Sequence, residues 1–278
     1  RAEALRLAGK VQGRRTTAEF SPPIEMPAGD WARTLRTSWT EPGYLETDAA
    51  WCAPGDEPVS PLENAGAFGG KVNSEVGEVA RRLAKDLNCM AVLAGYSRLV
   101  IDNNRQPGDP TGIPAASDDI IIPGNQDLSE AEQIARTDQF FWPYHHAITE
   151  AIAHLWRNGL PPAVFSVHTF TPSMNGEDRL WHIGVLWNRD PRMAEPLIQK
   201  LRDHGEGFHV GDNQPYSGKD IAFSLDMHAG GAGLPHCAVE IRQDLVTSPS
   251  GAEFWAEVLS EVLRDILSID DLHQVEHF

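Results

Sequence analysis

Short apolar runs and amphipathic periodicities alternate along the chain from residue 75 onward. Apolar runs of strand length predict β-strands at residues 91–94, 99–101, 163–167, 180–187, 208–210, 221–227 and 236–245. Helical spacing predicts helices at residues 75–88, 130–159, 193–204 and 252–267. This alternation predicts an α/β domain in which helices pack on a mixed, largely parallel sheet.

The helical region at 130–159 carries specific boundary signals. Ser129 and Glu132 have the spacing of a capping box, in which each side chain binds the other residue's backbone amide. Pro143 predicts a bend or a split within the region, because proline removes a backbone donor and clashes with the preceding turn. Gly159 is expected to end the helix.

Residues 1–70 show no periodic pattern long enough to predict an element, because prolines and small polar residues interrupt it repeatedly. We expect an irregular segment of loops and short elements, with a poorly ordered leader over residues 1–20. Trp31, Leu35, Trp39 and Trp51 would anchor this segment. Residues 71–278 are expected to form one α/β domain.

Composition narrows the class of protein. The 278 residues are 41% hydrophobic and contain no apolar run long enough to cross a bilayer, so we expect a globular protein that is not membrane-bound. Cys52, Cys89 and Cys237 are widely separated, without metal-site spacing or an even disulfide set. No signal sequence is evident, and a reducing cytoplasm is the expected location.

The net charge of -17 argues against nucleic acid as a partner, because acidic residues outnumber basic ones 40 to 23. A homo-oligomer remains possible. Histidine is distributed unevenly, since all 11 histidines lie at or after His145. The first half of the chain can therefore supply no imidazole to a site.

Ionisable residues accompany two of the predicted strands. His168 follows the apolar run 163–167, and Glu240, Arg242 and Asp244 alternate along 236–245, which predicts that all three share one face of a strand. Such residues are expensive to bury without partners or a chemical role. His168 could equally be a hydrogen-bonded structural residue, and Glu240 a buried partner of Arg242.

Four segments together resemble the N-formylglutamate amidohydrolase family. They are YSRLVIDNNR at 96–105, SVHTF at 166–170, GDNQPYSG at 211–218 and GLPHCAVEIRQD at 233–244, and the resemblance covers about residues 77–278. It implies a three-layer αβα sandwich related to zinc exopeptidases. The implied activity is the hydrolysis of an N-formyl or N-acyl amino acid, with a divalent metal, zinc in the first instance, activating water.

The resemblance also implies roles for individual residues. His168 is expected to bind the metal, Glu240 to act as the general base, and His228 to take part in the catalytic cleft. An acidic N-acyl amino acid carries two carboxylates, which arginine binds well. The expected substrate-binding residues are Arg98, Asn104, Arg105, Asn213, Tyr216 and Arg242. For Arg98, a structural pair with Asp102 is the alternative.

The chain departs from the family pattern before Gly77. Gly69 and Asn73 occupy positions where the family has a histidine and an aspartate, and an earlier metal-binding histidine has no counterpart here. Three explanations remain open: an altered or misread amino-terminal segment, a family member that binds small carboxylates without turnover, or a metal site rebuilt from other residues. A purely structural subunit is a further alternative.

Overall fold

A six-stranded mixed sheet lies at the centre of the computed structural model, which describes residues 48–52, 75–94, 96–117, 120–174 and 176–278. The strand order is β2-β1-β5-β10-β8-β9. Its strands are β1 (Asp48–Cys52), β2 (Met90–Leu93), β5 (Ala163–Phe170), β8 (Ile183–Leu186), β9 (Val210–Asp212) and β10 (His236–Arg242). Parallel pairing joins β5 to β10 and β8 to β9. The other three pairings among these strands are antiparallel.

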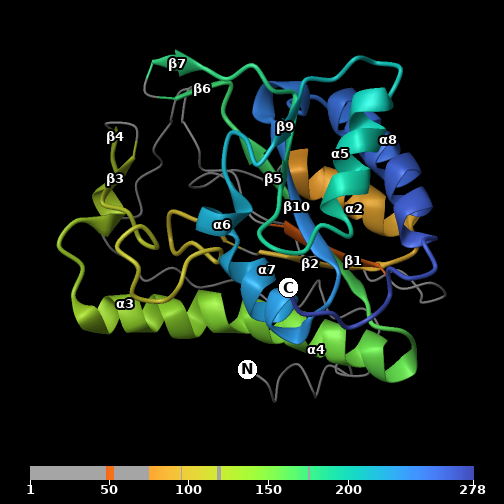
Figure 1. The fold of residues 1–278 in the computed structure, drawn as a ribbon. Coiled ribbons are helices and arrows are strands. Elements are labelled where there is room, and N and C mark those ends of the chain that lie inside the picture. Colours follow the sequence, from red (N-terminus) through yellow and green to blue (C-terminus); the bar gives the residue numbers. More distant parts are fainter. Residues whose placement is uncertain (1–47, 53–74, 95, 118–119, 175) are drawn as a thin grey trace.

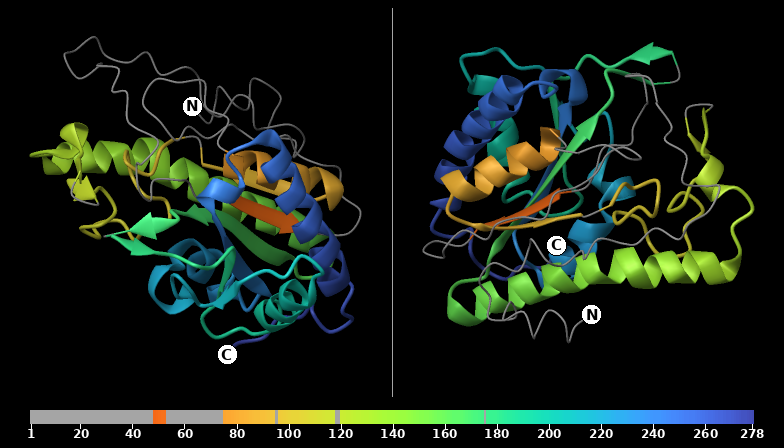
Figure 2. Two further views of the ribbon diagram at one scale, coloured as in Figure 1. Left: turned by 90° about the horizontal axis from the view of Figure 1, so that it is seen from above. Right: turned by 180° about the vertical axis from the view of Figure 1, so that it is seen from behind.

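Helices cover both faces of this sheet (Figures 1 and 2). The helices are α2 (Glu75–Asp86), α3 (Glu130–Arg136), α4 (Trp142–Asn158), α5 (Ala194–Asp203), α6 (Gly218–Ile221), α7 (Phe223–His228) and α8 (Pro249–Leu267). Phe165 and Val239 pack with α2, α5 and α8, whereas Val164 and Ala238 pack with α4 and α7. Because neighbouring side chains on a strand point to opposite faces, the two cores lie on opposite sides. The expected three-layer α/β fold is confirmed.

Short elements complete the described chain. Two small hairpins pair β3 (Ala116–Ser117) with β4 (Ile120–Ile121) and β6 (Ser173–Met174) with β7 (Glu177–Asp178). Single 3-10 turns occur at η2 (Pro123–Asn125), η4 (Gly230–Ala232) and η5 (Gln243–Leu245). The β6–β7 hairpin lies between β5 and β8 in the chain. Residue 179, just after it, lies close to the ends of β5 and β10, because its amide donates to the Pro172 carbonyl and its carbonyl accepts from Arg242.

The long helical region begins and breaks as its sequence predicts. The Ser129 side chain accepts a hydrogen bond from the Glu132 amide, and the Glu132 carboxylate accepts one from the Ser129 amide, so the capping box is confirmed. A π-helical segment, η3 (Thr137–Phe141), then separates α3 from α4. Pro143 lies in the first turn of α4, where a missing backbone donor costs little.

Two predicted strands are wrong. Residues 99 and 100 belong to a turn, in which the Val100 amide donates to the Ser97 carbonyl, and no strand of the described chain pairs with residues 99–101. Residues 221–227 alternate like a strand but belong to α6 and α7, where Ser224, Leu225 and His228 are buried at helical spacing. Periodicity in so short a segment does not separate the two states.

The boundaries of other elements also differ from the prediction. Strand β10 ends at Arg242, and η5 carries Asp244 off the strand face that it was expected to share. Strand β5 continues to Phe170, which places His168 inside the strand instead of beyond its end. Strand β9 begins at Val210, later than expected.

The expected domain boundary near residue 70 does not separate β1 from the rest of the fold. Strand β1 pairs with β2 on one side and β5 on the other, so residues 48–52 are an interior part of the sheet. The predictions for the leader, for Trp31, Leu35 and Trp39, and for positions 69 and 73 lie outside the described residues, as does the side chain of Trp51.

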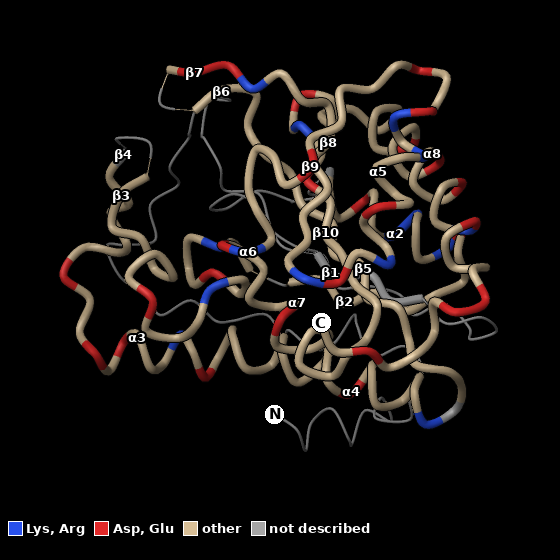
Figure 3. Tube along the Cα trace, in the orientation of Figure 1, with Lys and Arg blue, Asp and Glu red and all other residues tan. Residues whose placement is uncertain are grey.

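None of the helices in the described ranges has the length and apolar character needed to span a bilayer. Acidic side chains are spread along the chain, including α3 and α8, in keeping with the net charge of -17 (Figure 3).

Candidate active site

The candidate site is organised by a row of residues that runs across four strands of the sheet. His168 on β5 lies opposite Glu240 on β10, Glu240 lies opposite Gly184 on β8, and Gly184 lies opposite Gly211 on β9. Residues paired across neighbouring strands project from the same face. His168 and Glu240 therefore project side by side from the face that carries α4 and α7.

Glu240 is buried, and its Oε2 has no hydrogen-bond partner among the described residues. Burial raises the pKa of Glu240 to about 8, against the opposing influence of the positive charges on Arg98, Arg179 and Arg105. A buried carboxyl oxygen without a partner costs free energy, so its retention points to chemistry or to a ligand.

Arg98 and Asp102 form an ion pair beside Glu240. Asp102 is only 4% exposed, and its Oδ1 also accepts a 2.8 Å hydrogen bond from the Asn104 amide. Burial alone would raise the pKa of Asp102, but Arg98, Arg105 and these hydrogen bonds hold it below its usual value. The structure therefore contains the Arg98–Asp102 pair, which was the alternative to substrate binding by Arg98.

His168 is neutral in this environment. Burial, reinforced by the positive charge of Arg98, lowers the pKa of His168 to about 3. Its Nε2 lies 2.8 Å from the Ser166 hydroxyl, two residues earlier on the same strand face. The imidazole is thus held beside Glu240 by a neighbour on its own strand.

The two glycines of the row let a loop lie flat against the sheet. A Cβ atom at Gly184 would meet the Gln214 carbonyl oxygen at 2.0 Å, and one at Gly211 would meet the same oxygen at 2.5 Å. Any side chain at either position would displace the backbone that leads to Tyr216. The absence of a side chain at Gly184 of β8 and at Gly211 of β9 thus lets the loop that leads to Tyr216 approach the site.

Arg179 is a residue of this site that the sequence analysis missed. Its Nη1 donates a 2.8 Å hydrogen bond to the Tyr216 hydroxyl, and its guanidinium lies over the rings of Tyr216 and Phe170 at 4.9 and 5.9 Å. Its charge acts on Glu240. The position of Arg179 just before the apolar run 180–187 was its only signal in the sequence.

Three of the expected substrate-binding residues make side-chain hydrogen bonds within the protein: Asn104, Asn213 and Arg242. Asn104 donates to the Ile221 carbonyl and accepts from the Ser224 amide, which fixes α6 and α7 to the 102–105 loop. Asn213 accepts from the amides of Trp187 and Gly218. Arg242 binds both carboxylate oxygens of Asp244. Their expected contacts with substrate remain predictions.

His228 lies in a second cluster, with His145 of α4. His145 Nδ1 is 2.7 Å from His228 Nε2, and His145 Nε2 is 2.9 Å from the Asn103 carbonyl oxygen. That carbonyl can only accept, so His145 donates from Nε2 and accepts at Nδ1 from His228. Burial lowers the pKa of His145 to about 3 and that of His228 to about 4, and the pair is neutral.

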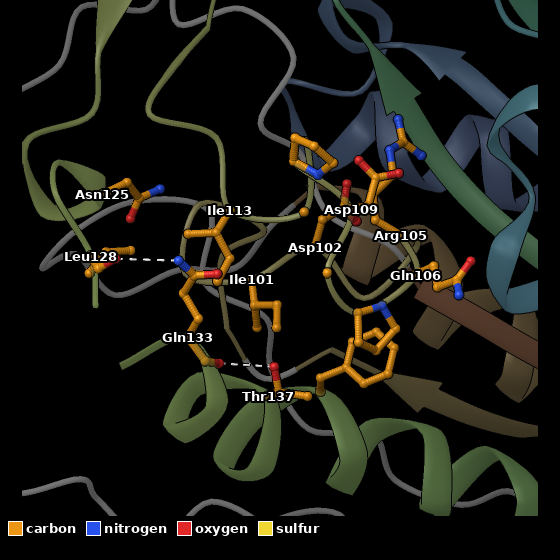
Figure 4. A pocket seen from close by; sticks show the side chains of 15 residues that line it. Ile101, Asp102, Arg105, Gln106, Asp109, Ile113, Asn125, Leu128, Gln133 and Thr137 are labelled. Carbon is orange, nitrogen blue, oxygen red and sulfur yellow. Dashed lines mark hydrogen bonds between the residues drawn. The ribbon is translucent and has the colours of Figure 1, made fainter. Parts of the chain in front are cut away.

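A cavity of about 200 Å³ opens beside the charged cluster, between the loop of residues 101–113 and the α3–η3 segment (Figure 4). Asp102 and Arg105 belong to its wall, opposite Gln133 and Thr137. Arg105 is held by its own loop, donating to the Asn104 carbonyl and the Thr111 hydroxyl.

The donor set around His168 does not fit a zinc ion as far as the described residues go. His168 and Glu240 are adjacent, but Asp102 is paired with Arg98, and no three His, Cys, Asp or Glu side chains in the described ranges converge as metal ligands. Zinc sites in proteins take at least three protein ligands. His145 and His228, which could have rebuilt a site, are bound to each other.

The chain is similar to a known protein family and to solved structures. The family described as N-formylglutamate amidohydrolase matches residues 72–247. A gene product of Agrobacterium tumefaciens is 34% identical in sequence, with a TM-score of 0.64 over 70% of this chain and 77% of that one. No curated protein matches the chain.

An N-formylglutamate amidohydrolase from Ralstonia eutropha JMP134 has the same fold. Its TM-score is 0.57 at 18% identity, over 81% of this chain and 98% of that one. The four sequence segments that carried the resemblance supply Arg98, His168, Tyr216 and Glu240, the residues that the fold gathers at one face of the sheet. This chain belongs to the N-formylglutamate amidohydrolase family and is an amidohydrolase.

Proposed function

We propose that this protein hydrolyses the amide C–N bond of an N-formyl amino acid with an acidic side chain, giving formate and the free amino acid. The observation that carries the proposal is Glu240, a buried carboxyl group near the centre of the sheet. One of its oxygens has no partner among the described residues, and the charges of three arginines act on it. Family membership supplies the reaction class.

Glu240 has the properties that proton transfer in amide hydrolysis requires. Water adds to the formyl carbon while a carboxylate takes its proton, and the resulting carboxyl group donates a proton to the amine nitrogen as the C–N bond breaks. A pKa of about 8 keeps both protonation states of Glu240 accessible near neutral pH. One residue can therefore serve as base and then as acid.

The positive charge of the site suits an anionic substrate. Arg98, Arg105 and Arg179 all act electrostatically on Glu240, in a chain whose net charge is -17. An isolated positive region in an acidic protein attracts anions selectively. Tyr216 and Asn213 lie on the loop that completes this region, which supports the expected place of the substrate.

Metal dependence is a separate part of the proposal. A divalent ion, zinc in the first instance, would polarise the amide carbonyl, with His168 as one ligand. Its remaining ligands would have to come from residues outside the described ranges. Those before His145 could only be carboxylates or cysteines, because that part of the chain has no histidine.

The test is an assay of formate release from a panel of N-formyl and N-acetyl amino acids, with elemental analysis of the same preparation. We expect release from N-formyl-L-glutamate, and about one equivalent of divalent metal that is lost in His168→Ala. Purified protein that releases no formate with or without added zinc would refute the proposal.

The incomplete donor set favours a second candidate function, in which the protein binds small carboxylates without turnover. This candidate predicts carboxylate binding that survives both a chelator and His168→Ala. Measurable turnover of any N-acyl amino acid would eliminate it.

A further inference from the structure

Three arginines, Arg98, Arg105 and Arg179, act electrostatically on Glu240, and Arg242 lies two residues beyond it on β10. These four arginines differ in whether an acid neutralises them. Arg98 pairs with Asp102, and Arg242 pairs with Asp244. Arg105 lies near two acids, Asp102 and Asp109, whose pKa values it helps to lower. Within the described part of the chain, Arg179 has no ion pair with any carboxylate.

Arg179 is nevertheless held firmly in place. Its Nη1 donates to the hydroxyls of Tyr216, at 2.8 Å, and Thr171, at 3.4 Å, and its Nη2 contacts the Met174 sulfur at 2.9 Å. Its own backbone amide donates to the Pro172 carbonyl. The Phe170 and Tyr216 rings flank the guanidinium, which adds cation–π attraction.

A fixed, half-buried guanidinium that has no carboxylate partner in the described ranges is suited to bind a carboxylate ligand. Neutral hydroxyls and rings orient the charge without cancelling it. We propose that Arg179 binds the α-carboxylate of the N-formyl amino acid and thereby places the formyl amide against Glu240. This inference rests on the proposed function and assigns one recognition element within it.

The α-carboxylate is favoured over the side-chain carboxylate by covalent geometry. The α-carboxylate and the scissile amide nitrogen are bonded to the same carbon, so a residue that holds this carboxylate must lie close to the catalytic group. Arg179 meets that condition because its guanidinium lies 5.9 Å from the Phe170 ring, two residues beyond His168 on the same face of β5, and its charge acts on Glu240. The substrate side chain then has the 200 Å³ cavity with Arg105 in its wall.

The experiment compares three substrates with wild type, Arg179→Met and Arg179→Lys. N-formyl-L-glutamate carries both carboxylates, N-formyl-L-glutamine lacks only the side-chain charge, and the α-amide of N-formyl-L-glutamate lacks only the α charge. Arg82→Met is the matched control, because Arg82 is an ion-paired arginine on α2, across the sheet from Glu240.

We expect Arg179→Met to lower kcat/KM by roughly 50-fold for both substrates that keep the α-carboxylate, on the scale of a lost charged hydrogen bond. For the α-amide the same variant should change kcat/KM by less than about threefold, since that contact is already absent. Arg179→Lys should fall between wild type and Arg179→Met. Arg82→Met should match wild type.

An equal loss for all three substrates, in a variant that unfolds at the wild-type denaturant concentration, would overturn the assignment. So would a loss confined to the two substrates with a charged side chain, N-formyl-L-glutamate and its α-amide. If wild type hydrolyses none of them, the proposed function fails, and calorimetry with N-formyl-L-glutamate decides the inference alone. Binding that Arg179→Met abolishes would support it, and binding that this variant leaves unchanged would refute it.

Discussion

Two buried polar clusters meet at the loop of residues 102–105, and they satisfy their polar groups in opposite ways. Around Glu240 lie the charged groups of Arg98, Asp102 and Arg179, and one carboxyl oxygen of Glu240 has no partner in the described chain. Around His228 the groups are neutral, and hydrogen bonds run in one direction from His228 to His145 to the Asn103 carbonyl.

This difference suggests a structural role for the histidine cluster and a chemical role for the Glu240 cluster. A chain of matched neutral donors and acceptors is stable by itself and joins α4, α7 and the loop. A buried carboxyl group of which one oxygen has no partner among the described residues is costly until a ligand or a proton transfer uses it. We therefore propose that proton transfer takes place at Glu240 and that His228 supports the loop that carries Asp102.

The largest effect is expected from a side chain at Gly184, one of the two glycines that let the Tyr216 loop approach the charged cluster. Gly184→Ala should lower the free energy of unfolding by about 4 kcal/mol, because its Cβ cannot coexist with the Gln214 carbonyl in the present backbone. Chemical denaturation measures the change. Gly205→Ala is the control, since a Cβ there meets nothing within 4 Å. Equal stability of the two variants would contradict the claim that Gly184 must lack a side chain.

The next largest effect is expected when the ion pair between Arg98 and Asp102 is broken. Asp102→Asn should cost about 3 kcal/mol of unfolding free energy, because it leaves the mostly buried Arg98 without its partner. Asp265→Asn, which removes the partner of Lys200 from an exposed pair, should change stability by less than about 1 kcal/mol. Similar losses in the two variants would show that the Arg98–Asp102 pair contributes no more than a surface pair.

Acidification should lower the free energy of unfolding through the His145–His228 cluster. The folded-state pKa values of His145 and His228, about 3 and about 4, lie below the ordinary value of 6.5. The stability that these neutral histidines contribute is therefore complete above pH 6.5 and is lost as pH falls toward 4. At pH 5 each should cost about 2 kcal/mol relative to pH 7.

Urea unfolding at pH 7 and pH 5 measures this loss, and the double variant His145→Asn with His228→Gln is the comparison. The double variant should show the smaller difference between the two pH values. If its pH dependence equals that of wild type, the pair is not neutral in the folded protein.

The smallest effect concerns the Thr149 hydroxyl, which donates to the His145 carbonyl and lies 3.4 Å from His228 Nδ1. Thr149→Val should cost about 1 kcal/mol, the usual contribution of one hydrogen bond, and leave kcat/KM within about twofold. A large loss of activity at unchanged stability would instead connect the histidine cluster to catalysis.

Much of the fold could be predicted from the sequence because its signals are local. The capping box at Ser129, the amphipathic face of α2 and the apolar run of β5 each lie within one segment. Segment 221–227 failed because seven residues fit a strand and a helix equally well until tertiary contacts decide.

The site was predictable where a motif carried it and not where contacts between distant residues define it. His168 and Glu240 lie within recognisable segments, and the sheet register brings them together. The Arg179 side chain is positioned by a hydrogen bond to Tyr216, 37 positions away in the sequence. His145 is hydrogen-bonded to His228, 83 positions away. Neither pairing leaves a pattern that a single sequence can show.

The most direct test of the account is kcat/KM for formate release from N-formyl-L-glutamate, measured together for wild type, Glu240→Gln and His228→Gln. We predict that Glu240→Gln loses roughly a thousandfold, the scale of a general acid–base group, and that folded His228→Gln stays within about tenfold of wild type. A folded His228→Gln that loses as much activity as Glu240→Gln, or a Glu240→Gln variant that retains wild-type turnover, would contradict the assignment of the chemistry to Glu240.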